Sequence, residues 1–302
     1  MFAVSATAFQ SCLPGASLEH NQRLRGGLHF RIFRLRQIWF PNTHMKSYLR
    51  TLSGFSGRCL LNAYKLDGFR GAYVVTCHAF LTKVPLAPRL HSIGLIDHRA
   101  ELMNYLDNFV MGELRCPEIE DHLQTQTRPV IIDVGINVGV TVRWWLHLNA
   151  KAKIIGIDMM QESLEFTTRK LEKWGSTVDW CPICIGVSDT AGVAELVVSD
   201  PLDGTTAIDN SVGNIHRSVN LMTMDEVLAR RGLDQIDLLK VDIEGHGGKA
   251  LLGAEKTLAI TRYVVFETHN REETRLAQKT LAVAGFALWR VSGRTMWWER
   301  SI

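Results

Sequence analysis

The chain lacks the features that mark membrane-spanning, disulfide-rich or secreted proteins. No apolar run approaches the ~18 residues that a membrane span needs, and the N-terminus lacks the basic segment and long apolar segment of a secretory signal. Six cysteines are scattered through 302 residues, and a chain of this length can bury a core without disulfides. We therefore expect a cytoplasmic protein with reduced thiols.

The chain also has little net charge, +3 at pH 7, and that charge is concentrated at one end. Residues 1–44 hold five arginines and one glutamate, so the rest of the chain is close to neutral. Binding to a nucleic-acid backbone needs a basic surface on the folded part of a protein. The charge distribution therefore argues against nucleic acid as a partner and favours a small or weakly charged substrate, while the oligomeric state stays open.

The one close pair of cysteines does not have the context of a redox or metal site. Cys181 and Cys184 lead into the strand-like residues CIGV, whereas a redox CxxC opens a helix after a strand. No second CxxC and no pair of histidines completes the four ligands of a structural zinc site. We therefore expect both cysteines to be structural, assign no metal ligands and leave metal dependence open.

The pattern of apolar residues divides the chain into three parts. Residues 1–44 are basic and amphipathic, which predicts a loosely ordered extension, or a stretch upstream of a working start at Met45, in preference to a helix on a surface or membrane. Residues 45–127 suggest short strands followed by a helix, with no chemistry that we can assign. Residues 128–302 have a regular pattern and form the expected catalytic domain.

That domain alternates short strand-like runs with segments of helical period. The runs are VIIDV, KIIGID, WCPICIGVSD, IDLLKVDIEG and RYVVFETH. Such alternation predicts parallel crossover units in a doubly wound α/β sheet. The final stretch, FALWRVSGRTMWWER, instead predicts two strands joined at Gly293 as an antiparallel hairpin.

A glycine-bearing loop, Asp133-Val-Gly135-Ile-Asn137-Val-Gly139, follows the first run. Ligands of open parallel sheets lie beyond the carboxyl ends of the strands, and Gly135 and Gly139 allow close approach of the backbone. The dinucleotide fingerprint G-x-G-x-x-G is absent, and the Asp133 carboxylate would repel a pyrophosphate. We therefore expect S-adenosylmethionine, which offers an ammonium and a sulfonium cation and no phosphate.

Polar residues also end the second and third runs. Asp158 lies 25 residues after Asp133, which suits a carboxylate that holds the ribose diol of a nucleoside. Ser188 and Asp189 end the third run, where they can accept a hydrogen bond from an adenine amino group. For each acid taken singly a helix N-cap is an equal alternative, but the series of acids favours a nucleoside site.

The segment KVDIEGH, residues 240–246, is the densest polar cluster. Alternation along a strand places Asp242 and Glu244 on the same side, where they suit the methionine end of the cofactor and a substrate hydroxyl. The alternative is an exposed strand end in which Lys240 merely pairs with Asp242. At the end of the fifth run, His269 is a candidate base.

Together these motifs resemble the FkbM family of S-adenosylmethionine-dependent methyltransferases. The similarity covers residues 129–300 and consists of IIDVGINVG, LMTMDEVL, IDLLKVDIEGHGGKALLGA and VVFETH in that order. It implies a class I, Rossmann-like domain with a mostly parallel seven-stranded sheet. It also implies O-methylation of hydroxyls, or in some members carboxylates, on sugars, polyketides or related natural products, so the expected partner is a small molecule or glycan.

This chain departs from the family pattern at two places. The family commonly has Glu-x-Pro at residues 158–160, where this chain has Asp-Met-Met and keeps the carboxylate. The family usually has Gly-Ala-Glu at residues 245–247, where this chain has Gly-His-Gly and lacks the second acid. We expect cofactor contacts at Asp133, Gly135, Asn137, Gly139, Asp158, Met159, Ser188, Asp189 and Asp242. Our ordered candidates for accepting the acceptor's proton or orienting the acceptor are His269, Glu244 and His246.

Two other functions are compatible with the fold. A nicotinamide-dependent oxidoreductase is disfavoured by the missing third glycine and by Asp133. A catalytically silent protein that binds S-adenosylmethionine stays open because of the missing acid at Gly247.

Overall fold

The computed structural model describes residues 57–58, 60–66, 68–69, 71–73, 99–173, 178–202 and 213–301. The chain divides into two compact units, Met1–Pro88 and Arg89–Ile302. In the first unit the described residues are helical, Ala63 is buried, and the rings of Tyr64 and Phe69 meet edge to face with their centroids 5.3 Å apart. The expected extension over residues 1–44 lies outside the described residues, and the expected boundary at residue 127 stays a prediction.

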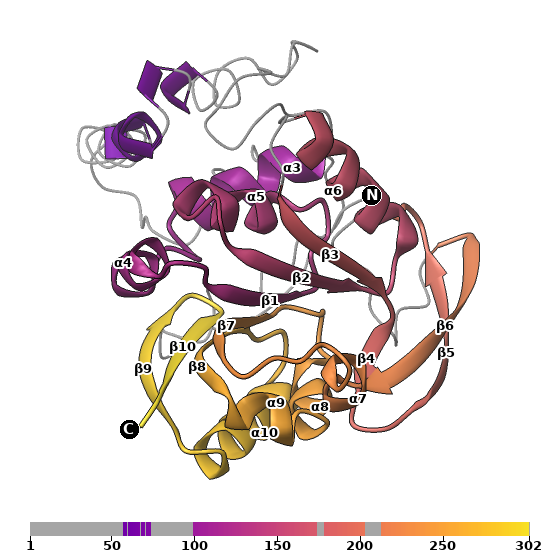
Figure 1. Cartoon of the computed structure of the whole chain (residues 1–302). Coiled ribbons are helices and arrows are strands. Elements are labelled where there is room, and N and C mark those ends of the chain that lie inside the picture. The colour runs from indigo at the N-terminus through magenta and orange to yellow at the C-terminus, as the bar shows by residue number, and fades with distance from the viewer. Residues whose placement is uncertain are drawn as a thin grey trace, which may run out of the picture. The chain divides into compact units, whose positions relative to one another are not determined.

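The second unit contains a seven-stranded sheet with the strand order β3-β2-β1-β7-β8-β10-β9 (Figure 1). Its strands are β1 (Val130–Val134), β2 (Lys153–Asp158), β3 (Asp179–Cys184), β7 (Ile236–Val241), β8 (Thr261–Glu267), β9 (Phe286–Ser292) and β10 (Thr295–Arg300). Strands β3, β2, β1, β7 and β8 are parallel, and β10 is antiparallel to both β8 and β9. The expected doubly wound sheet with an antiparallel hairpin at its end is thus confirmed, with the turn at Gly293.

Strands β1, β2 and β7 lie inside the sheet, with a neighbouring strand on each side, and each is a near-continuous apolar run. All six residues of β7 and all but the first of β1 are buried, as expected for parallel strands covered on both faces. Three charged residues interrupt β1 and β7, namely Asp133 in β1 and Asp237 and Lys240 in β7, and Asp133 and Lys240 are direct partners in the parallel register. Burial of two opposite charges side by side points to a role for this pair in the site.

Helices cover both faces of this sheet (Figure 1). On one face lie α3 (Arg99–Asn104), α5 (Val140–Leu148) and α6 (Gln161–Lys173), and on the other α8 (Gly247–Leu252), α9 (Glu255–Ala259) and α10 (Arg271–Val283). The π-helix η2 (Tyr105–Val110) directly continues α3. Within the described ranges, no helix combines the length and the apolar character needed to cross a membrane.

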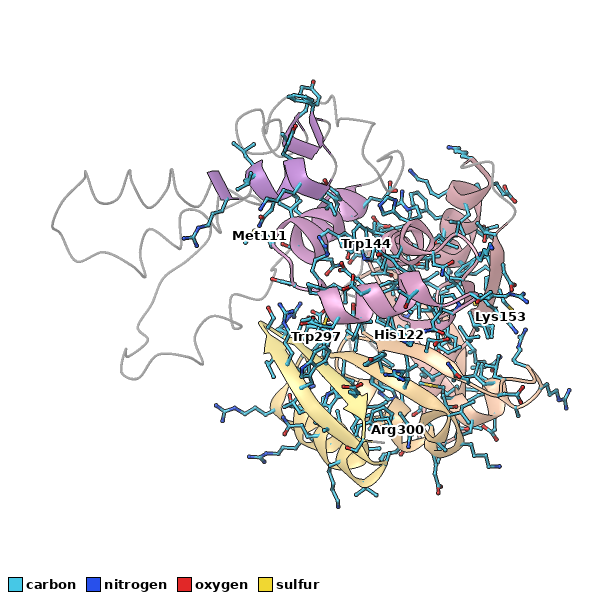
Figure 2. The ribbon with its side chains drawn as sticks, turned by 60° about the vertical axis from the view of Figure 1, so that its left-hand side comes forward. Met111, His122, Trp144, Lys153, Trp297 and Arg300 are labelled. Carbon is cyan, nitrogen blue, oxygen red and sulfur yellow. The ribbon has the colours of Figure 1, made fainter. Side chains whose placement is uncertain are left out.

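The helix α4 (Pro117–Thr125) is anchored to the sheet by His122. Its Nε2 lies 3.0 Å from Oδ1 of Asp237 in β7, and its ring meets that of Tyr263 in β8 edge to face at 5.2 Å between centroids. Figure 2 shows His122 on this helix, with Trp144 on the neighbouring α5. The second oxygen of Asp237 accepts a hydrogen bond from the amide of Val130. Asp237 therefore joins both α4 and the start of β1 to β7.

One strand differs from the sequence expectation, because the third run is not a single strand. It divides into β3 and the short β4 (Gly186–Ser188), which leaves the large sheet and pairs with β6 (Ile215–Thr223). Together with β5 (Gly192–Val198) these strands form a second sheet of order β4-β6-β5. Cys181 and Cys184 lie in β3 as free cysteines, consistent with their strand-like context.

Candidate active site

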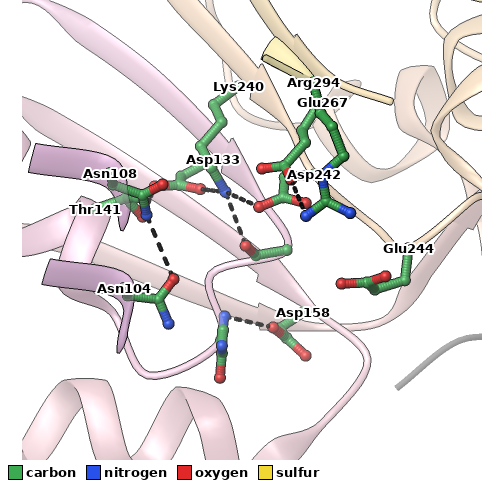
Figure 3. Close-up of polar contacts among 12 residues, drawn as sticks. Asn104, Asn108, Asp133, Thr141, Asp158, Lys240, Asp242, Glu244, Glu267 and Arg294 are labelled. Atoms are coloured by element: carbon green, nitrogen blue, oxygen red, sulfur yellow. Dashed lines mark hydrogen bonds and ion pairs between the residues drawn. The ribbon is translucent and has the colours of Figure 1, made fainter. Parts of the chain in front are cut away.

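The polar residues that follow β1, β2, β7 and β8 meet at one edge of the large sheet (Figure 3). This follows from the parallel arrangement, which brings the carboxyl ends of neighbouring strands together. The sequence analysis placed most candidate residues at these strand ends. The structure shows which of them are brought into contact.

The two glycines of the loop after β1 have positive φ angles and leave no room for a Cβ atom. Gly135 has a φ of +79°, and a Cβ on it would lie 1.9 Å from the carbonyl oxygen of Asp242. Gly139, with a φ of +67°, precedes α5, and a Cβ there would lie 2.3 Å from Oγ1 of Thr167. The loops after β1 and β7 therefore touch backbone to backbone, a closeness that only glycine permits at residue 135.

The carboxylate of Asp133 is fully buried and held by three donors. Oδ2 accepts from Oγ1 of Thr141 at 2.7 Å and from Nε1 of Trp145 at 3.0 Å, and Oδ1 lies 3.1 Å from Nζ of Lys240. Lys240 also donates to the carbonyl oxygen of Gly135 at 2.9 Å. Asp133 thus acts on the glycine loop through Lys240, and the expectation that it touches the cofactor directly stays a prediction.

Asp158, at the end of β2, connects the glycine loop to the loop after its own strand. Its Oδ2 accepts from the amide of Asn137 at 3.0 Å, and its Oδ1 accepts from the amide of Met160 at 2.8 Å. Burial raises the pKa of Asp158 to about 6, although the hydrogen bonds from these two amides favour the charged form. Asn137 has a φ of +49°, and its buried Oδ1 has no hydrogen-bond partner among the described residues. Met159, partly buried, packs against the small apolar cluster that contains Met160.

Ser188 and Asp189 lie at the end of β4 and not at the end of β3. Oγ of Ser188 donates to Oδ1 of Asp189 at 2.9 Å and lies 2.9 Å from Nε2 of His246, which precedes α8. Ser188 and His246 are buried, and Asp189 is exposed. The structure therefore brings His246, one of the three catalytic candidates, beside Ser188.

The other two catalytic candidates, His269 and Glu244, do meet, together with Asp242. Nε2 of His269 lies 3.5 Å from Oε2 of Glu244 and 3.6 Å from Oδ1 of Asp242. Strand β7 ends at Val241, so the turn that follows it, and not strand alternation, aims the two carboxylates. Glu244 has a φ of +36° in this turn, an unusual conformation for a residue with a side chain.

This group of charges shifts the protonation of its members. Burial and the Asp242 carboxylate raise the pKa of Glu244 to about 7, against the opposing charge of His269. Burial alone would lower the pKa of His269, but the Glu273 carboxylate and the charges of Glu244, Asp242 and Glu267 raise it to about 9. At neutral pH His269 is therefore protonated in this arrangement, so it donates hydrogen bonds and is a poor base.

Glu273 in α10 is a buried acid of this site that the sequence analysis missed. Its Oε1 accepts from the amide of Gly247 at 2.9 Å, and its Oε2 accepts from the amide of His269 at 2.7 Å. A Cβ on Gly247 would lie 3.1 Å from Oε1 of Glu273, so this carboxylate fills the space beside the position where the family pattern has an acid. In the sequence Glu273 reads only as an acid in the first turn of a helix, so no signal distinguished it.

Three further polar residues of the site were not identified from the sequence. Nη2 of Arg294, in the turn between β9 and β10, lies 2.7 Å from Oε1 of Glu267. Asn104 and Asn108, from a region to which no chemistry was assigned, lie on the side of the glycine loop near Asp133 and Thr141 (Figure 3). Nδ2 of Asn108 donates to Oδ1 of Asn104 at 3.3 Å, across the start of η2.

The sequence of this domain matches a known protein family. The model of the methyltransferase FkbM domain matches residues 133–287, which include the glycine loop, the acids and His269. The chain belongs to the FkbM methyltransferase family. This finding confirms the resemblance drawn from the sequence motifs, and it makes S-adenosylmethionine the cofactor of the domain.

Two curated relatives are methyltransferases. Methyltransferase sdnD of Sordaria araneosa is 25% identical over 191 residues, which cover 53% of this chain and 74% of the relative. The 2-O-methyltransferase NoeI of Sinorhizobium fredii is 25% identical over 161 residues, which cover 48% of this chain and 65% of that protein. The similarity is therefore to part of this FkbM-family chain and to part of each relative.

Solved structures that resemble the chain are also methyltransferases. Magnesium protoporphyrin IX methyltransferase (ChlM) from Synechocystis PCC 6803, with bound SAM, is 12% identical with a TM-score of 0.40 and covers 81% of this chain and 97% of its own. TrmK of M. capricolum, in complex with S-adenosylhomocysteine, is 13% identical with a TM-score of 0.35 and covers 60% and 65%. The strand order of this FkbM-family domain, and not these alignments, defines its fold.

The residues of the FkbM-family site fit S-adenosylmethionine. The buried Oδ1 of Asn137 has no partner within the described part of the chain, and a buried acceptor of this kind normally has one. Each oxygen of Asp158 accepts one hydrogen bond and has capacity for another, as the diol of a ribose requires. Asn137 and Asp158 would therefore hold polar groups of the nucleoside, and the glycine loop leaves room for backbone contact.

Proposed function

We propose that this FkbM-family protein transfers a methyl group from S-adenosylmethionine to an oxygen, most simply a hydroxyl, on a small natural product or glycan. The observation that carries the proposal is the group formed by Asp242, Glu244 and His269 beside the glycine loop. Carboxylates accept hydrogen bonds from hydroxyls, and a protonated imidazole donates them. The group therefore suits an oxygen nucleophile, and NoeI, a relative of this chain, is named as a 2-O-methyltransferase.

The protein has to position the acceptor oxygen more than it has to activate the methyl group. When bound, S-adenosylmethionine supplies a methyl group that its sulfonium already activates. The protein has to hold the acceptor oxygen in line with that methyl group and to remove the hydroxyl proton. Asp158 and Asn137 would hold the nucleoside, and the Asp133–Lys240 pair fixes the glycine loop. Asp242 and His269 would orient the acceptor, and Glu244, whose pKa is raised to about 7, would accept the hydroxyl proton. His246, beside Ser188, positions the adenine side instead.

A carboxyl acceptor is the second possibility for the same site. A carboxylate has no hydroxyl proton to lose, and it would be repelled by Asp242 and Glu244. Arg294, which pairs with Glu267, and the protonated His269 could offset only part of this repulsion, because both already face carboxylates of the site. We therefore favour a hydroxyl. We further propose that the protein works in the cytoplasm, without a nucleic-acid partner, because the described cysteines are free thiols and the net charge is small.

The first test is a titration of the purified chain with S-adenosylhomocysteine and, separately, with NAD⁺ and NADP⁺. We expect saturable binding of S-adenosylhomocysteine alone, and tight binding of a dinucleotide instead would replace the proposal with an oxidoreductase. The second test incubates the protein and S-adenosylmethionine with sugars, aliphatic alcohols and carboxylic acids and detects methylated products by mass spectrometry. Methylation of acids alone would refute the preference for a hydroxyl.

The variant Glu244→Gln separates a catalytic protein from a silent one. We expect this variant to bind S-adenosylhomocysteine as the wild type does and to lose methyl transfer, because the change removes a charge that faces the acceptor. The matched control is Glu272→Gln, the same change at an exposed residue. Equal transfer by Glu244→Gln and the wild type would remove Glu244 from the mechanism.

A further inference from the structure

His269 is the least satisfied polar side chain of the site. Its side chain is only 9% exposed, and within the described residues neither ring nitrogen has a hydrogen-bond partner, although four carboxylates lie 3.5–3.8 Å from the ring. Leaving a buried polar group without a hydrogen bond costs ~1–3 kcal/mol, so this histidine calls for an explanation. The explanation has to satisfy Nε2, because that nitrogen lies beside the carboxylates of both Asp242 and Glu244.

The distances around Nε2 are close to those of ligands that share an ion. Nε2 lies 3.6 Å from Oδ1 of Asp242 and 3.5 Å from Oε2 of Glu244, which is too long for good hydrogen bonds. One ligand atom from each of these three side chains lies within 4.8 Å of the other two. With bonds of 2.0–2.2 Å, ligand atoms around one cation are roughly 3.0–3.5 Å apart. A small movement of the carboxylates would bring all three to that separation.

Charge also favours a cation at this point. Lys240 lies closer to Asp133, at 3.1 Å, than to Asp242, at 3.6 Å. Arg294 is engaged by Glu267 at 2.7 Å. Lys240 and the imidazole therefore offset these two carboxylates only from 3.5–3.6 Å away, and a divalent cation between Asp242 and Glu244 would offset their mutual repulsion at shorter distance.

The second ring nitrogen of His269 lies near a carboxylate, as the second nitrogen of metal-binding histidines usually does. Nδ1 of His269 lies 3.6 Å from Oε2 of Glu273, so a small shift of the ring would let Nδ1 donate to this carboxylate. A carboxylate bonded to the second nitrogen typically fixes the tautomer that leaves Nε2 free for a metal. Glu273 is itself held by the amides of Gly247 and His269, and its own amide donates to Oδ1 of Asn270. The carboxylate therefore presents a fixed acceptor to the ring.

Glu244 is held in its place by an unusual backbone conformation. Its φ of +36° lies in the left-handed region, and such conformations concentrate at ligand sites. The next residue, Gly245, has a φ of +90°, so the whole turn after β7 is shaped to aim Glu244 toward His269.

We propose that Asp242, Glu244 and His269 bind a divalent cation of the Mn²⁺ and Mg²⁺ class, which replaces the proton on Nε2 of His269, with Glu273 positioning His269. Two carboxylates and one imidazole suit Mn²⁺ best, because Mg²⁺ prefers oxygen ligands. Three protein ligands leave positions for water or for an oxygen of the acceptor, and an acceptor hydroxyl on the cation would lose its proton more readily. That role in methyl transfer rests on the function proposed above, whereas the binding of the cation does not.

The experiment measures Mn²⁺ binding by electron paramagnetic resonance on the full chain after treatment with a chelator, with and without S-adenosylhomocysteine. We expect one site in the wild type, and at least ~10-fold weaker binding in Glu244→Gln and in His269→Asn, because each loses a ligand. Glu273→Gln should weaken binding by about tenfold while all three ligands stay in place. The control Glu272→Gln, one residue away and exposed, should bind as the wild type does.

Thermal unfolding and S-adenosylhomocysteine titration of each variant show whether a loss of Mn²⁺ reflects the site or the fold. Absence of a stoichiometric Mn²⁺ site in the folded wild type would overturn the inference, as would wild-type affinity in both Glu244→Gln and His269→Asn. If the protein transfers methyl groups in excess chelator at its full rate, the cation has no part in the reaction and that role is refuted. If Mn²⁺ binds and no acceptor is methylated, the site stands and the proposed function does not.

Discussion

Nζ of Lys240 lies 3.1 Å from Oδ1 of Asp133, and both side chains are buried in the centre of the sheet. The two residues are register partners on β1 and β7, so the strand pairing itself brings the charges together. Burial alone would lower the pKa of Lys240, but the carboxylates of Asp133 and Asp242 raise it. The lysine is therefore charged, and it holds the carbonyl of Gly135 in the cofactor loop.

The first prediction concerns this pair. Replacing Asp133 with Ala should lower the free energy of unfolding by ~3–5 kcal/mol, because it leaves a buried ammonium without its partner. The measurement is urea unfolding of Asp133→Ala, Lys240→Met and the double variant. In the double variant the loss should be smaller than the sum of the single losses, since neither charge is left unpaired. A stable Asp133→Ala variant that has lost S-adenosylhomocysteine binding would instead favour direct contact of Asp133 with the cofactor.

The second prediction concerns the contact between the loops after β1 and β7. Gly135→Ala should weaken S-adenosylhomocysteine binding by at least ~10-fold, since the added Cβ would lie 1.9 Å from the Asp242 carbonyl and push the loop from its place. The matched control is Gly232→Ala, at a φ of +57° with no atom within 4 Å of the added Cβ. It should lose only roughly 1–2 kcal/mol of stability from backbone strain and keep its affinity. Equal affinities in the two variants would contradict the prediction.

The third prediction concerns pH and Asp158, whose pKa is raised to about 6. Above that pH the carboxylate is ionised and accepts hydrogen bonds from a ribose diol, so S-adenosylhomocysteine affinity should fall as pH drops from 7.5 to 5.5. The effect on folding has the opposite sign. The pKa in the folded protein exceeds the ordinary value of 3.8 for an aspartate, so ionisation destabilises the fold as pH rises through about 6.

Calorimetric titration of the wild type and Asp158→Asn across this range provides the measurement. The amide of the variant does not titrate, so its affinity should be lower at pH 7.5 and should vary less with pH. An identical pH profile in both proteins would show that another group controls binding.

The fourth prediction concerns a family motif, LMTMDEVL, whose acid is structural in this chain. Oδ1 of Asp225 accepts from the amide and from Oγ1 of Thr257, both at 2.8 Å, and Oδ2 accepts from the amide of Lys256 at 2.9 Å. Asp225→Ala should therefore reduce stability by roughly 1–2 kcal/mol, as the loss of a helix cap does, without changing S-adenosylhomocysteine affinity. Asp234→Ala, at an exposed residue, is the control. A selective loss of affinity in Asp225→Ala would place Asp225 in the site.

The sequence by itself determined the sheet and the edge at which the site lies. Apolar runs of strand length, alternating with helical segments, force parallel crossover connections, and polar residues at the ends of such strands must then share one edge. The glycine loop, Asp158, Asp242 and Glu244 were therefore placed at this edge from local patterns, and the terminal hairpin at Gly293 was predicted in the same way. The sequence did not predict that β4 leaves the large sheet, because its pairing with β6 depends on a distant segment of the chain.

Only the tertiary structure decided which of these groups act together. It paired Asp133 with Lys240 across two strands, brought His246 to Ser188, and joined His269 to Asp242 and Glu244 by a turn with a positive φ. It also brought Glu273 from a helix surface into the space beside Gly247. Such contacts join residues far apart in the chain, and protonation and cation binding depend on distances of a few ångströms between charges. A sequence pattern records the residue types at the strand ends, but not those distances.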